Sequence, residues 1–217
     1  MVDYRNLRPH NLGSSEFRHL FLLLFWPVYG LAFLAVERLI PRSYYAPVWC
    51  PADDLIPFCE WFIIPYTLWF LFVVGMHIYL LLTDIPAFRR MMYFIILTYS
   101  ITIGIYLIWP TCQQLRPEVL PRDNLLCRFV AGYYRMDTNT NVCPSIHVLG
   151  SMAVCFGAWD TKRLQTPGWK TAFFLTALLI SVSTLFVKQH SAVDVMTGLL
   201  LSWLAYTVIY VIPGGKK

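Results

Sequence analysis

The sequence predicts an all-α integral membrane protein, with residues 1–217 folded as a single domain of six transmembrane helices. Hydrophobic residues make up 58% of the chain and charged residues only 13%, whereas about a quarter of the residues in a soluble domain are charged. The apolar residues also form runs close to the roughly 20 residues that a helix needs to cross a bilayer. The formal charge of +5 is small and dispersed, so we expect no nucleic-acid partner.

The first half of the chain contains three of these apolar runs. Polar residues 1–16 precede a run at 17–40, which is too long for a cleaved signal peptide and lacks a small-residue cleavage site. The next two runs lie at 58–82 and 91–111 and are separated by a polar turn. Pro65 is expected to kink the second span, because proline removes a helical hydrogen bond.

The second half begins with a long polar connection. Residues 112–143 carry charged side chains between apolar patches, and we expect them to form a lid at the membrane surface. A short fourth span follows at 144–159 and opens on a proline, a favoured first helical residue. The apolar stretch 171–212 has four polar residues near its centre, which would be costly inside one membrane helix. We therefore divide it into spans at 171–187 and 191–212.

The distribution of Lys and Arg favours a cytosolic N-terminus. In that orientation, ten of the 17 Lys and Arg residues lie on the cytosolic side, namely Arg5, Arg8, Arg18, Arg89, Arg90, Lys162, Arg163, Lys170, Lys216 and Lys217. We expect a multi-pass protein of the cell membrane with both termini in the cytosol. The lid, the start of the fourth span and the turn between the last two spans then converge on the outer face.

The polar residues within the last apolar stretch include His190 and Asp194. Residues four apart on a helix share one face, so the carboxylate can fix the tautomer and the orientation of the imidazole. The other ring nitrogen is then free to attack an electrophile, to take a proton or to bind a metal ion. This pair of residues alone leaves all three roles open.

Other polar residues expected on the outer side of the membrane indicate phosphate chemistry. Ser145 and His147 stand at the start of the fourth span, where free main-chain N–H groups favour an anion. Arg116 in the lid could hold two phosphate oxygens with its guanidinium, and Lys188 lies close to His190 in the chain. Together these residues contain the parts needed for displacement at phosphorus.

Structural roles are the alternative for each of these residues. His77 in the second span is expected to be a buried side chain with a main-chain partner, and Arg116 could pair with Glu118. His147, His190 and Asp194 could instead bind zinc or iron. Because the neighbouring cations would repel a metal ion, we expect no metal and no other cofactor.

Three short motifs resemble those of the type 2 phosphatidic acid phosphatase superfamily, which includes lipid phosphate phosphatases and haloperoxidases. The family pattern is KxxxxxxRP, then PSGH, then SRxxxxxHxxxD on a six-helix membrane bundle. The matching residues here are Arg116-Pro117, then Pro144-Ser145-Ile146-His147, then Ser183 followed by His190 and Asp194. The resemblance covers the chain from about the third span onward.

The chain departs from this pattern at three positions. Trp109 stands in place of the first Lys, Thr184 in place of the Arg after Ser183, and Ile146 in place of the glycine. Two phosphate-binding cations are therefore missing, and a phosphodiester with one negative charge would need fewer of them. In this respect the chain resembles the branch of inositol phosphorylceramide synthases and sphingomyelin synthases.

The resemblance implies a role for each matching residue. His190 would be the nucleophile that forms a phosphohistidine, Asp194 would orient it, and His147 would act as the acid and then the base. The phosphoryl oxygens would be held by Arg116, Ser145, Ser183 and Lys188. The expected substrate is a phospholipid or another lipid phosphate. The open alternatives are head-group transfer in place of hydrolysis, and a catalytically silent protein that binds or transports lipid.

The cysteines leave a further choice open. Cys50, Cys59, Cys112, Cys127 and Cys143 lie on or near the expected outer side. An oxidising exterior would permit a disulfide from Cys112 to Cys127 that tethers the lid, whereas free thiols packed as small hydrophobic groups are the alternative. We expect the lid arginines Arg122, Arg128 and Arg135 to form a solvated or headgroup-contacting face. The alternative is that they pair with the acidic residues Asp53, Asp54 and Glu60.

Overall fold

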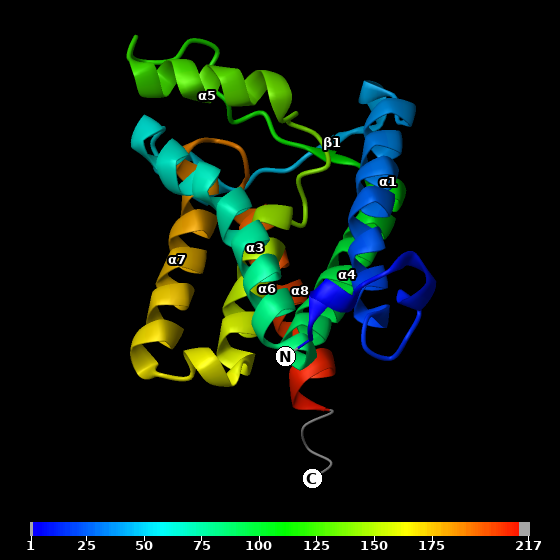
Figure 1. The fold of residues 1–217 in the computed structure, drawn as a ribbon. Helices are drawn as coiled ribbons and strands as arrows, with labels where there is room; N and C mark the ends of the chain where they lie inside the picture. The colour runs from blue at the N-terminus through cyan, green and yellow to red at the C-terminus, as the bar shows by residue number, and fades with distance from the viewer. Residues whose placement is uncertain (1, 213–217) are drawn as a thin grey trace.

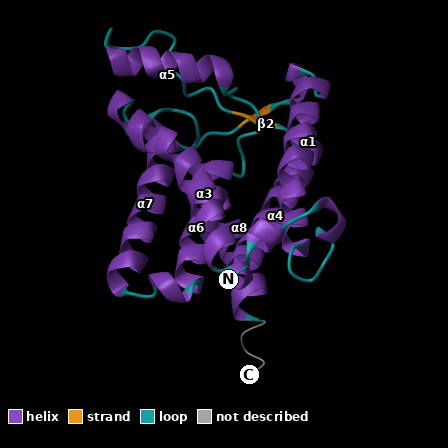
Figure 2. Cartoon of the chain, in the orientation of Figure 1, coloured by secondary structure: helices purple, strands orange, loops and turns teal. Residues whose placement is uncertain are grey.

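The computed structural model describes residues 2–212 and is nearly all-α (Figures 1 and 2). The longer helices are α1 (Phe25–Leu39), α3 (Ile63–Thr83), α4 (Ile85–Ile108), α5 (Leu125–Met136), α6 (Ile146–Asp160), α7 (Pro167–Phe186) and α8 (Ala192–Tyr206). The short elements are α2 (Pro51–Leu55), β1 (Ala46–Pro47) and β2 (Thr111–Cys112). A 3₁₀ segment at Arg18–Leu24 leads into α1, another at Glu60–Phe62 leads into α3, and a π-helical segment at Thr207–Val211 extends α8.

Among the described residues, five helices are long and apolar enough to cross a membrane: Arg18–Leu39, Glu60–Thr83, Ile85–Ile108, Pro167–Phe186 and Ala192–Val211. These helices support the expectation that the chain is a membrane protein. The sixth expected span is α6, which has 15 residues and is about 22 Å long at 1.5 Å per residue. A membrane core is about 30 Å thick, so the count of six spanning helices stays a prediction.

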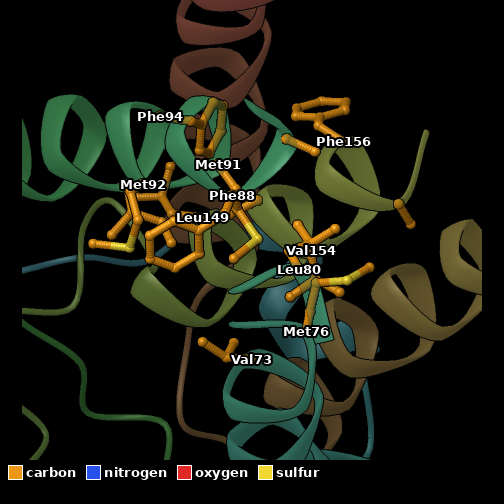
Figure 3. Packing of buried hydrophobic residues seen from close by; sticks show 14 of the residues in the cluster. Val73, Met76, Leu80, Phe88, Met91, Met92, Phe94, Leu149, Val154 and Phe156 are labelled. Atoms are coloured by element: carbon orange, nitrogen blue, oxygen red, sulfur yellow. The ribbon is translucent and has the colours of Figure 1, made fainter. Parts of the chain in front are cut away.

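Helix α6 forms the centre of the bundle. It contacts α3, α4, α7 and α8, and 11 of its 15 residues are buried. Figure 3 shows Leu149 and Val154 of this helix packed with Phe88, Met91 and Met92 of α4, all of which are fully buried. A helix that is apolar all round and enclosed by others needs no lipid-facing surface, which is why it can be shorter than its neighbours.

The expected starts of α4 and α6 are wrong, each because of a capping residue, and Pro65 does not lie where it would kink a span. Helix α4 begins at Ile85 instead of residue 91, since Asp84 caps it by accepting from the N–H of Ala87 at 3.1 Å. Helix α6 is capped by Ser145, so the preceding proline lies outside the helix. Pro65 lies in the first turn of α3, where its missing N–H breaks no helical hydrogen bond, and not in the middle of a span.

The connection from α4 to α6 lies across one end of the bundle, opposite the N-terminal segment (Figure 1). It contains α5, an amphipathic helix with Cys127 and Val130 on its buried face. Strand β2 at its start pairs in parallel with β1, with Ala46 opposite Thr111. Arg122 binds Glu60 at 2.7 and 2.8 Å, so the alternative pairing is formed for that acidic residue. We call residues 112–143 the lid.

The partners of His77, of Arg128 and of the cysteines were also left to the structure. Nδ1 of His77 contacts the carbonyl of Val73 at 2.7 Å, the kind of main-chain partner that was expected. Arg128 pairs with Asp123, at 2.9 Å, and not with an acidic residue before α3. All six cysteines lie within the described residues and are free, so the disulfide from Cys112 to Cys127 is absent. Lys216 and Lys217, which entered the charge count, lie outside the described residues.

Candidate active site

The polar turn between α7 and α8 breaks the last apolar stretch into two helices. Lys188 adopts a φ of 54°, in the left-handed region that few side chains tolerate. The N–H groups of Gln189 and His190 both donate to the carbonyl of Thr184, at 2.9 and 3.2 Å. Helix α8 then starts at Ala192, with Ser191 as its N-cap. His190 is therefore in the turn and not on a helical face shared with Asp194.

A capping interaction brings His190 and Asp194 together instead. Asp194 is the third residue of α8, and its Oδ2 accepts from the N–H of Ser191 at 2.9 Å. The same oxygen lies 3.1 Å from Nδ1 of His190. Because the carboxylate can only accept, the neutral imidazole of His190 carries its proton on Nδ1, and its Nε2 has a free lone pair.

Nε2 of His190 points at the second histidine. It lies 3.2 Å from Nδ1 of His147, in the first turn of α6. Since Nε2 accepts, Nδ1 of His147 donates, and a chain of hydrogen bonds runs from His147 through His190 to Asp194. All three side chains are buried, with 8%, 5% and 0% of their surface exposed respectively. Three sequence positions spread over 48 residues thus form one buried cluster.

The ring of His147 is held between two aromatic side chains of α3. Its centroid lies 4.7 Å from that of Tyr66 and 4.6 Å from that of Trp69. Gly150, one turn further along α6, makes room for this packing. A Cβ at Gly150 would lie 2.8 Å from Nε1 of Trp69 and 2.9 Å from the hydroxyl of Tyr99. The position therefore excludes any side chain while Trp69 remains in place.

Helices α6 and α8 meet next to these histidines. The N–H of Ser145 donates to the carbonyl of Asp194 at 3.1 Å, and Ser145 Oγ accepts from the N–H of Val148 at 3.5 Å. Gly198 permits the close approach, because a Cβ there would lie 3.2 Å from the carbonyl oxygen of Ser145. The first N–H groups of α6 have no acceptor within the helix, and they lie beside the histidine pair.

Asp53 of α2 supports the turn from the other side. Its Oδ2 accepts from Ser191 Oγ at 2.6 Å and its Oδ1 from the N–H of Ala192 at 2.8 Å. The ammonium of Lys188 donates to the main-chain carbonyls of Asp53, at 2.9 Å, and of Ile56. The alternative pairing of Asp53 with a lid arginine is therefore not formed. Because its partners in this turn lie almost 140 residues away, no local pattern could have identified them.

Arg116 ties the lid to the same turn. It donates to the carbonyls of Tyr134 at 3.1 Å and Asp137 at 2.7 Å, and to the side-chain oxygen of Gln189. Its guanidinium also lies 4.5 Å from the ring centroid of Tyr134. Nε of Arg116 is buried without a partner among the described residues. The alternative pairing with Glu118 is not formed, and Gln189 is a site residue that the sequence interpretation missed.

The remaining expected phosphate ligands are less accessible. Ser183 Oγ donates to the carbonyl of Ile180 at 2.6 Å and is fully buried. Burial lowers the pKa of Lys188 from its ordinary value, and the nearby carboxylates of Asp53 and Asp54 oppose this effect. Burial likewise lowers the pKa of Arg116, and Asp137 opposes that effect. Neither cation extends freely into solvent.

A pocket of about 330 Å³ reaches His147 from the side. It lies between α3 and the end of α5, and its lining includes Asp137. An apolar groove of about 530 Å³ runs beside it between the same two helices, and Thr67 lines both. The described residues contain no group of three or more His, Cys, Asp or Glu side chains placed to hold a metal ion.

The family comparison matches more than half of the chain. The model of the PAP2 superfamily matches residues 91–217, which include Arg116, His147, His190 and Asp194. Searches of curated proteins and of solved structures found no match.

Proposed function

Because the chain belongs to the PAP2 superfamily, we propose that it is a membrane phosphatase or phosphotransferase that cleaves a lipid phosphate ester through a phosphohistidine. The family supports activity on phosphate esters, and the apolar helices support a membrane location. The lipid substrate and the covalent intermediate are our proposal. The observation that carries it is the buried hydrogen-bonded chain from His147 through His190 to Asp194.

In the first step, Nε2 of His190 attacks phosphorus and the ester P–O bond breaks. Asp194 holds the proton on Nδ1 and stabilises the positive charge that develops on the ring, as a carboxylate behind a histidine does in other nucleophilic sites. The departing alkoxide takes a proton from His147, which acts as the general acid. His147 therefore enters this step as the imidazolium, protonated on both ring nitrogens, and leaves it neutral. The products of this step are an alcohol and a phosphohistidine.

In the second step, a water molecule or an acceptor alcohol loses its proton to His147 and attacks phosphorus. The P–N bond breaks, and the electron pair returns to Nε2 of His190. Attack by water releases a phosphate or a phosphomonoester, whereas attack by an alcohol forms a new phosphate ester. His147 regains its starting proton in either case, so the cycle is balanced.

The substrate must separate the two imidazole rings before it can react. Their nitrogens are 3.2 Å apart, which leaves no room for a phosphoryl group between them. Bond formation to phosphorus therefore replaces the hydrogen bond between the rings, and the proton on Nδ1 of His147 becomes available to the leaving oxygen. Hydrogen bonds in substrate-free sites often differ from those formed during reaction.

A lipid substrate suits the surroundings of this site. The apolar groove between α3 and α5 is lined by Leu68, Leu71, Leu125, Leu126 and Phe129 among others. An acyl chain could occupy it while the phosphate reaches the histidines through the adjoining pocket. We place this end of the bundle at the outer membrane surface, in keeping with the charge distribution of the sequence.

The choice between hydrolysis and head-group transfer depends on the number of cations. Trp109 and Thr184 stand where the family motifs carry Lys and Arg. A phosphodiester carries one negative charge and needs less compensation than a phosphomonoester, which favours a substrate like those of the inositol phosphorylceramide and sphingomyelin synthases. A silent lipid-binding protein would have no need of the buried histidine pair.

The test uses purified protein in detergent, a panel of phospholipids and mass spectrometry of the products. Free phosphate or a phosphomonoester would indicate hydrolysis, and a new phospholipid would indicate transfer. His190→Ala should abolish turnover and the covalent phosphohistidine trapped by alkaline quenching. Asp194→Asn should retain a residual rate, lower by about 10²–10⁴-fold. His77→Ala removes a buried histidine outside the site and should keep both signals. Normal turnover by His190→Ala would refute the nucleophile assignment.

A further inference from the structure

The pocket beside His147 combines aromatic side chains with one carboxylate. Its lining includes Tyr66, Trp69, Phe70, Tyr133, Asp137 and His147. A cavity that served only an acyl chain would need no carboxylate, and the lining of the adjoining groove has none. We call this cavity the aromatic pocket.

The carboxylate of Asp137 lines this pocket and accepts hydrogen bonds only from uncharged groups. Its Oδ2 accepts from the hydroxyl of Tyr66 and from Nε2 of Gln189, at 3.2 Å in the second case. Both donors are neutral. Arg116 binds the main-chain carbonyl of Asp137, and no Lys or Arg of the described chain makes a salt bridge to its side chain. Its Oδ1 accepts no hydrogen bond from the described residues.

Aromatic rings and a carboxylate favour the same kind of ligand. The face of an aromatic ring carries partial negative charge and attracts a cation, most strongly for a quaternary ammonium ion that sheds little water. A neighbouring carboxylate adds direct attraction to that cation. A second phosphate would be repelled by Asp137, and an acyl chain would remove the carboxylate from water without compensation.

We propose that the aromatic pocket binds an ammonium group carried by the substrate. This rests on the proposed function in one respect, since it takes the ligand to be part of a phosphate ester held at His190. The phosphate then lies near Arg116 and the histidines, and the ammonium lies against Asp137 and the rings. The substrate class is a zwitterionic phosphodiester with a choline-like or ethanolamine-like head group.

A binding experiment tests the pocket without any turnover. The probes are choline and 3,3-dimethylbutan-1-ol, which has the same shape but a carbon in place of the charged nitrogen. Isothermal titration of the purified protein in detergent should show choline binding about tenfold or more tightly than the neutral analogue. Asp137→Asn should remove most of this preference. Asp123→Asn removes a lid carboxylate that pairs with Arg128 outside the pocket and should leave it unchanged.

A second variant protects the test against a folding defect. Asp137→Asn also alters contacts to Tyr66 and Gln189, so Tyr133→Leu is measured beside it. Tyr133 packs edge-on against Tyr66, at 5.5 Å between centroids, and its hydroxyl makes no hydrogen bond to the described residues. Its replacement should weaken choline binding several-fold and spare the neutral analogue.

The outcomes separate this proposal from the proposed function. Equal binding of the two probes by the wild-type protein, or a full choline preference in both variants, would overturn the ammonium site whatever the enzyme does. Choline preference together with no turnover of any phospholipid would support the site and count against the reaction. Faster turnover of phosphatidylglycerol than of phosphatidylcholine with matched acyl chains would also contradict an ammonium site.

Discussion

Replacing Gly198 by alanine tests whether close contact between α6 and α8 sets the geometry of the histidine pair. A Cβ at this position would lie 3.0 Å from Cβ of Val148 and 3.2 Å from the main-chain oxygen of Ser145. Neither atom can rotate away, since one is the first atom of a β-branched side chain and the other belongs to the main chain. Carbon atoms in contact prefer about 3.5–4.0 Å. The two helices must therefore separate by about 0.5–1 Å.

The cost of that separation has a stability part and a catalytic part. An added methyl group in a tight core usually costs about 1–3 kcal/mol, which lowers the melting temperature of a chain of this size by about 2–4 °C for each kcal/mol. The same shift acts on the hydrogen bond from Ser145 to Asp194, which is 3.1 Å long. A displacement of about 1 Å in catalytic groups can reduce a rate about 10²-fold.

The assay compares kcat and melting temperature of Gly198→Ala with those of Gly157→Ala in the same detergent. A Cβ at Gly157 would also be crowded, at 3.0 Å from Sδ of Met91 and 3.2 Å from Cδ1 of Leu80. Those are the ends of flexible side chains, and they lie in the core away from the histidines. Gly157→Ala should therefore change kcat little. If Gly198→Ala kept its full rate, or if both variants lost activity equally, the reasoning would be wrong.

Three further outcomes follow from contacts near the site. Asp53→Asn should lower the free energy of unfolding by about 1–3 kcal/mol, because a buried acceptor of the Ser191 hydroxyl becomes a poorer partner; an unchanged melting curve would contradict this. Arg116→Lys should speed proteolysis of the lid, because an ammonium cannot make the separate contacts of a guanidinium fork; equal cleavage rates would refute the anchoring role. Burial raises the pKa of Cys143 from 9.0 to about 11, so its thiol should stay protonated near pH 9 and react with iodoacetamide only as the pH approaches the raised value. Alkylation at pH 9 as fast as in the unfolded chain would show that the thiol is not shielded.

The main features of the fold could be predicted from composition and from polar residues in apolar surroundings. Charged and imidazole groups at membrane depth are costly, so His190 and Asp194 stood out in the last apolar stretch. The spacing of these two residues predicts that their side chains interact, and the structure places them 3.1 Å apart. It does not predict how they meet, because the interaction depends on a capping box at Ser191 and not on a continuous helix.

Contacts between distant segments were the part that sequence patterns could not supply. Asp53, Asp137 and Gln189 each make side-chain hydrogen bonds to side chains at least 50 residues away. Periodicity and capping signals act over a single helix or turn, so they cannot pair such residues. The start of α4 is a different case, since Asp84 followed by Pro86 is a local signal for a helix start, and it predicts the observed boundary better than hydropathy does.

The cations closest to the histidines already donate hydrogen bonds to protein groups, and this limits the negative charge that the substrate can carry. The terminal nitrogens of Arg116 donate to main-chain carbonyls and to Gln189, and the ammonium of Lys188 donates to two further carbonyls. Carbonyl oxygens neutralise a cation only partly, so each retains some attraction for an anion. Trp109 and Thr184 add no charge of their own. A phosphoryl group at His190 would therefore meet limited positive charge, which suits an ester with one negative charge better than one with nearly two. An ammonium group on the same molecule would further reduce the charge to be compensated, so the proposed phosphodiester substrate and the aromatic pocket support each other.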